Sequence, residues 1–180
     1  MSARPQDSTD VAWRRGRRRD RGLVLLELAL VLLVAALGLG LGLTLAGRAA
    51  HRRNCDNYIR DLRVFSAAFA DYFQQEKTWP PGGSADVPLP AQLATTLNGT
   101  NWFRGSPLGG NYGWVAPFSA DAAGGGVVTL TAFSPSFPLK LDRADLLYID
   151  GQLDDGNLAT GRFRTGFNGW PVYLVEAAKR

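Results

Sequence analysis

Eight residues near the C-terminal end, Asp150 to Asn157, concentrate oxygen-bearing side chains in the sequence DGQLDDGN. Carboxylate and amide oxygens presented by turns are the ligands that calcium prefers. Asp150, Asp154, Asp155 and Asn157 are therefore a candidate calcium site. The stretch lacks EF-hand spacing and a closing bidentate glutamate, so two β-turns in a hairpin, Asp-Gly and Asp-Asp-Gly-Asn, are the favoured account of the same residues.

The inventory of side chains limits nucleophilic and metal chemistry. The chain has one cysteine, Cys55, and one histidine, His51. A single cysteine excludes an intrachain disulfide and a multi-thiolate metal cluster, and a single histidine excludes most nucleophile–base and zinc constellations. We expect His51 to be a solvated side chain among arginines. No two carboxylates stand out as a paired acid and base, so the protein is not expected to be an enzyme.

One carboxylate, Glu27, interrupts a long apolar segment. The only polar side chains in residues 23–46 are Glu27 and Thr44. At about 1.5 Å per residue, a helix of this length spans the hydrocarbon of a bilayer. A charged group is unfavourable there unless it is paired. Glu27 therefore either pairs with a cation or extends to the membrane interface near the start of the helix.

The excess positive charge of the chain lies before this segment. Residues 1–22 hold seven of the 20 basic and three of the 16 acidic residues, which leaves 13 of each in residues 23–180. A neutral remainder argues against nucleic-acid binding. By the positive-inside rule, residues 1–22 stay in the cytoplasm and the residues after the segment lie outside it.

Residues 47–78 are expected to continue the apolar helix as an amphipathic one. Large side chains recur there at steps of three and four, which places them on one helical face: Tyr58, Leu62, Phe65, Phe69 and Tyr72. No proline occurs between Pro5 and Pro80, so one helix can run from residue 23 to about residue 77. The Trp79-Pro80-Pro81-Gly82 sequence then ends it.

Residues 79–180 are expected to form a β-rich head. Short apolar or alternating runs lie between turn-forming residues, and we predict strands within 112–118, 127–133, 145–150 and 170–177. The predicted fold class is α+β, with a long N-terminal helix packed on a small antiparallel sheet.

The start of the apolar segment resembles the prepilin processing motif of type IV pilins and type II secretion pseudopilins. Gly22 follows a basic leader, the residues from Leu23 to Leu26 are apolar, and Glu27 is the fifth residue after the glycine. The resemblance implies a pilin-like fold and a prepilin peptidase that removes residues 1–22 by cutting after Gly22. It also implies methylation of the new terminus at Leu23, where many family members have phenylalanine.

The resemblance implies a structural subunit of a type IV pilus or a type II secretion pseudopilus. Its partners would be homologous subunits, the prepilin peptidase, the inner-membrane assembly platform and membrane lipid. The chain would cross the bacterial inner membrane once, with a periplasmic head, before it enters the filament. Glu27 would pair with the terminal amine of a neighbouring subunit. Major pseudopilins carry a calcium site late in the head, and the single cysteine excludes the disulfide loop of many adhesive pilins.

A membrane-tethered binding module on a plain single-span anchor is the alternative function. Four tryptophans, Trp79, Trp102, Trp114 and Trp170, together with Tyr112, could form a surface that stacks on sugars. Packing in the core or at the rim of a small head accounts for the same residues and is the favoured interpretation.

Overall fold

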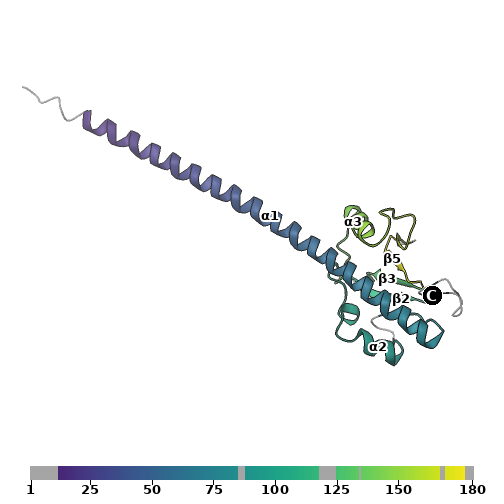
Figure 1. The fold of residues 1–180 in the computed structure, drawn as a ribbon. Helices are drawn as coiled ribbons and strands as arrows, with labels where there is room; N and C mark the ends of the chain where they lie inside the picture. The colour runs from purple at the N-terminus through teal and green to yellow at the C-terminus, as the bar shows by residue number, and fades with distance from the viewer. Residues whose placement is uncertain (1–11, 85–87, 118–124, 134, 167–168, 177–180) are drawn as a thin grey trace, which may run out of the picture. The chain divides into compact units, whose positions relative to one another are not determined.

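The structure is a computed structural model that describes residues 12–84, 88–117, 125–133, 135–166 and 169–176 (Figure 1). The chain divides into two compact units, Met1–Ala50 and His51–Arg180. Among the residues that the structure describes, the first unit contains helix only, and the second contains helices and one sheet. The predicted α+β fold class is confirmed.

Helix α1 covers Ala12–Glu76. Its C-terminal end agrees with the prediction, since Lys77 has a φ of 59° and the two prolines follow shortly after. The helix begins earlier than predicted, within the arginine-rich leader. Arginine is a good helix former and no proline follows Pro5, so nothing in the local sequence stops the helix at residue 23.

The sheet has five antiparallel strands in the order β1-β2-β3-β5-β4. Their bounds are Gly83–Ser84 for β1, Asn111–Val115 for β2, Val127–Thr131 for β3, Phe163–Thr165 for β4 and Pro171–Leu174 for β5. Three of the four predicted runs contain a strand, namely β2, β3 and β5. The short strands β1 and β4 were not predicted, because two or three residues carry no readable alternation.

The amphipathic stripe of α1 forms the centre of the core, as predicted. Tyr58, Leu62, Phe65 and Phe69 are buried, and Tyr72 is half-buried. The rings of Phe69 and Trp114 stack with centroids 4.0 Å apart, which joins the helix to β2. Helix α2 (Ala91–Leu97) and the 3-10 helix η1 (Asn101–Phe103) add further buried side chains, Leu93, Leu97 and Trp102.

The strand predicted at 145–150 is wrong, because these residues belong to helix α3, Arg143–Leu153. Asp142 caps the helix: its Oδ1 accepts the backbone N–H of Asp145 at 2.8 Å, and its own N–H donates to Asp145 Oδ2 at 3.0 Å. This capping box satisfies two backbone donors and favours a helix over a strand. The Asp150-Gly151 turn of the expected hairpin is therefore the last turn of α3.

Candidate functional site

The N-terminal unit presents an apolar helix with no partner among the described residues. Every side chain from Val24 to Ala50 is exposed, and the large apolar ones from Val24 to Leu45 are 55–75% exposed. One helix of the described chain is long and apolar enough to cross a membrane. Burial of such a surface requires lipid or other chains, since an exposed apolar patch of this size is unfavourable in water.

Glu27 lies in this exposed part of α1 and forms no hydrogen bond or ion pair with any side chain that the structure describes. The backbone of Gly22 and Leu23 is helical as well, within the same helix. The three residues of the processing motif therefore share one uninterrupted helical segment. The carboxylate of Glu27 has no counter-charge among the side chains that the structure describes.

The oxygen-bearing residues predicted near the C-terminal end do converge. Asp150, Asp154 and Asp155 each place one carboxylate oxygen within 4.8 Å of the others. Asp150 is fully buried, and neither of its oxygens has a hydrogen-bond partner among the described residues. Burial, reinforced by the charges of Asp155 and Asp154, raises the pKa of Asp150. An unpaired buried carboxylate beside two others is the arrangement that a divalent cation stabilises.

The remaining oxygens of this group are partly engaged. Asp155 accepts from the Asn157 backbone N–H and from the Thr160 hydroxyl, both at 2.8 Å, and these two hydrogen bonds lower the pKa of Asp155. Asn157 uses its side-chain oxygen to accept the Ala159 backbone N–H at 3.2 Å. Asp154 accepts backbone N–H groups of Arg162 and Phe163. Each oxygen keeps a second lone pair, so the group fits calcium, with Asp150 as the unsatisfied ligand.

The proposed sugar-stacking surface is not formed. Trp79, Trp102, Trp114 and Tyr112 are at most 4% exposed and pack on aromatic rings of α1. Trp170 alone is partly exposed, and its ring contacts Phe133 edge-on. Four of the five side chains offered for sugar binding are therefore core residues, in agreement with the favoured interpretation.

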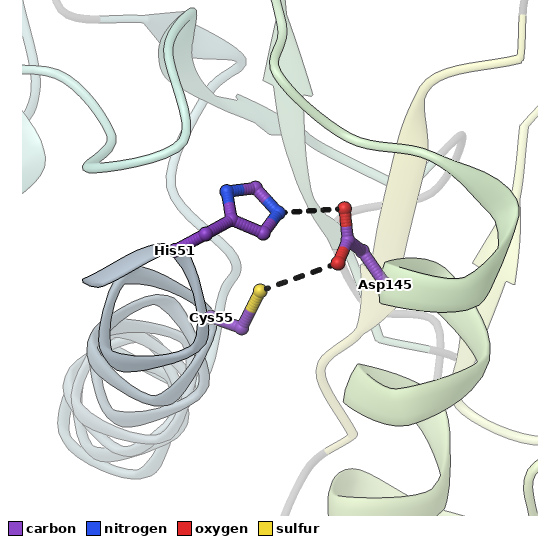
Figure 2. A group of neighbouring side chains, drawn as sticks. All are labelled: His51, Cys55 and Asp145. Atoms are coloured by element: carbon purple, nitrogen blue, oxygen red, sulfur yellow. Dashed lines mark hydrogen bonds and ion pairs between the residues drawn. The ribbon is translucent and has the colours of Figure 1, made fainter. Parts of the chain in front are cut away.

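A second cluster, which the sequence analysis did not find, consists of His51, Cys55 and Asp145 (Figure 2). His51 and Cys55 lie one turn apart on α1, and Asp145 reaches them from the first turn of α3. His51 Nε2 lies 2.8 Å from Asp145 Oδ2, and Cys55 Sγ lies 3.9 Å from Asp145 Oδ1. His51 is therefore not a freely solvated side chain, as its position among arginines had suggested. The spacing of four residues was the available signal, but Asp145 is 90 residues away in sequence from Cys55.

The chain thus combines a bilayer-length apolar helix with an α+β globular unit. The globular unit contains both candidate metal-binding clusters, the oxygen-rich group and the group of His51, Cys55 and Asp145. No protein-family model, no curated protein and no solved structure matches this chain at a significant level.

Proposed function

We propose that this chain is a prepilin-like structural subunit of a type IV pilus or a type II secretion pseudopilus and not an enzyme. In this proposal a prepilin peptidase of the bacterial inner membrane cuts after Gly22 and methylates Leu23. Residues 1–22 are cytoplasmic before the cut, and the β-rich unit is periplasmic. The exposed apolar part of α1 rests in the membrane and then packs against the same helix of neighbouring subunits.

The observation that carries the proposal is the coincidence of the motif with an unpartnered apolar helix. The motif consists of a basic leader, Gly22, and Glu27 at the fifth position after Gly22. It lies at the start of a segment whose described side chains are all exposed in the isolated chain. The same helix continues into the core of an α+β unit, where one face of its C-terminal part is buried. A structural subunit needs both properties, a folded head and a helix surface left free for lipid and for other subunits.

The chemistry of the cut supports a role for Glu27. Hydrolysis after Gly22 creates a positive amine on Leu23 at the apolar end of the helix, four residues before Glu27. A carboxylate and an amine from neighbouring subunits neutralise each other where either charge alone is unfavourable. Such a pair also fixes the axial register between helices, as buried polar contacts do in coiled coils.

Mass spectrometry of the protein extracted from membranes tests the proposal. Co-expression with a prepilin peptidase should give a mature chain that begins at a methylated Leu23. A Gly22→Val variant should stay uncut, whereas Gly16→Val, which changes another glycine of the same leader, should be cut normally. An N-terminus at Met1 in the wild-type chain would favour a plain anchor for a membrane-tethered binding module. A cut beyond residue 46 would indicate a secretory signal peptide.

A further inference from the structure

We propose that His51, Cys55 and Asp145 form a binding site for a divalent ion of the zinc class, which links helix α1 to helix α3. The proposal is independent of filament assembly, and it concerns a different place from the oxygen-rich group at Asp150. The three side chains bring an imidazole nitrogen, a sulfur and a carboxylate to one point, as Figure 2 shows.

The donor atoms lie close to the spacing that a tetrahedral ion requires. A zinc ion with bonds of about 2.0–2.3 Å holds its nitrogen and oxygen ligands about 3.3 Å apart and its sulfur about 3.6 Å from either. The His51 Nε2–Asp145 Oδ2 distance is 2.8 Å and the Cys55 Sγ–Asp145 Oδ1 distance is 3.9 Å. All three donors lie within 4.8 Å of one another. Small side-chain rotations therefore bring them to coordination distance.

The types of donor select the ion. Imidazole and thiolate favour zinc, cobalt and copper, whereas calcium and magnesium take oxygen ligands almost alone. A deprotonated Cys55 and Asp145 together carry two negative charges, which a divalent cation neutralises. Three protein ligands leave a fourth tetrahedral position for water. His51 and Asp145 side chains are 40% and 15% exposed, so solvent reaches that side of the cluster.

The same geometry argues against a catalytic triad. In a thiol-dependent triad the histidine lies between the cysteine and the acid, because it must take the proton from sulfur. Here Asp145 lies in the middle and both other side chains point to its carboxylate (Figure 2). Cys55 is fully buried, so its sulfur is out of reach of an external substrate. A thiol of this kind is a poor nucleophile at neutral pH.

Binding proceeds by exchange of a proton for the ion. The S–H bond of Cys55 breaks, a metal–sulfur bond forms, and the proton passes to solvent. His51 binds through Nε2: the Nε2–H bond that faces Asp145 breaks, its proton passes to solvent, and Nδ1 carries the one proton of the neutral ring. Asp145 loses its contact with His51 Nε2 but stays in the first turn of α3, where Asp142 Oδ1 accepts the backbone N–H of Asp145. The ion then provides the covalent-like link that a chain with one cysteine cannot obtain from an intrachain disulfide.

Cobalt is the spectroscopic probe for the test. The full-length chain, purified in detergent without a polyhistidine tag and treated with a chelator, is titrated with Co²⁺. One equivalent should produce a thiolate-to-cobalt charge-transfer band and the intense visible bands of a tetrahedral ion, and zinc should then displace the cobalt. Zinc should also raise the melting temperature of the globular unit.

Variants assign the ligands. Cys55→Ser should lose the charge-transfer band, and His51→Gln and Asp145→Asn should each bind cobalt at least about tenfold more weakly. Asp71→Asn, a change of an exposed carboxylate on α1 that belongs to neither cluster, should bind like the wild type. His51→Gln alters a partly exposed side chain and so remains informative if a change at buried Cys55 unfolds the protein. A wild-type chain without the band, a band that survives in Cys55→Ser, or full affinity in His51→Gln would overturn the proposal.

Discussion

Tyr112 on β2 donates its phenolic hydroxyl to Asp61 Oδ2 on α1 at 2.8 Å, which ties the middle of the sheet to the helix. Asp61 also accepts from the side-chain amide of Asn101, at 2.9 Å to the same oxygen. Tyr112 is fully buried, with its ring edge-on to Phe65 at 4.8 Å between centroids. A single half-buried carboxylate on α1 thus holds both the sheet and the segment at η1.

The Tyr112→Phe variant should destabilise the globular unit by about 2 kcal/mol. The ring and its packing remain, while the hydrogen bond to a charged acceptor is lost. Urea unfolding of the full chain in detergent, followed by tryptophan fluorescence, measures the change. Tyr148→Phe is the matched control: Tyr148 donates to Asp56 at 2.6 Å, but at the surface, so the loss of this hydrogen bond should lower the stability much less than Tyr112→Phe does. Equal effects of the two changes would contradict this assignment.

Alkaline pH should destabilise the fold through Tyr112. Burial first, and then the charge of Asp61, raise the pKa of its phenol above that of an exposed tyrosine. Since the folded value lies above the unfolded value of about 10, stability is fully present below about pH 10 and is lost as pH rises further. Urea midpoints measured from pH 8 upward should fall steeply in the wild type and less in Tyr112→Phe. Parallel pH profiles for the two proteins would show that another group is responsible.

The sequence predicted the helical stripe because its period is local: Tyr58, Leu62, Phe65 and Phe69 are spaced three or four residues apart and all are buried. It misjudged residues 145–150 because an apolar run of six residues fits a strand or a helix, and the Asp142 cap that decides between them lies outside the run. The meeting of Asp145 with His51 depends on how α3 packs on α1, which no local pattern encodes. The oxygen-rich group was found because all its members lie within eight residues.

Replacement of Asp150 by asparagine should stabilise the protein in calcium-free buffer at neutral pH. The pKa of Asp150 is raised by burial and by its acidic neighbours, so its charged form opposes folding and stability falls as pH rises above about 4. Asp150→Asn removes that charge and should gain about 1 kcal/mol, or roughly 3 °C in melting temperature. Thermal melts in the presence of a chelator measure this change in melting temperature. A lower melting temperature in the variant would mean that the carboxylate has a favourable partner.

Calcium should reverse the order of the two melting temperatures, so that the wild type becomes more stable than Asp150→Asn. An ion held by Asp150, Asp154 and Asp155 stabilises only the folded state, by about 2.7 kcal/mol when calcium exceeds its dissociation constant a hundredfold. The melting temperature of the wild type should therefore rise with calcium, while that of Asp150→Asn should not. Asp71→Asn, an exposed change on α1, is the control and should respond like the wild type. No response of the wild type to calcium would mean that the last turn of α3 and the turn that follows it account for this stretch without an ion.

Substitution of Glu27 should separate processing from assembly. Glu27 is exposed and forms no contact with any described side chain, so Glu27→Ala and Glu27→Gln should insert into the membrane and fold normally. Peptidase recognition through Gly22 should persist, and mass spectrometry should find the chain beginning at Leu23. Incorporation into filaments, measured as the sheared or cross-linked fraction, should fall at least tenfold, about 1.4 kcal/mol per subunit contact, because the amine of the next subunit stays unpaired in a low-dielectric environment.

Glutamine keeps the size and polarity of the Glu27 side chain but not its charge, so a defect in both variants assigns the effect to the ion pair. Normal assembly of both would instead place the carboxylate at the membrane interface, where water and the helix N-terminus stabilise it without a partner.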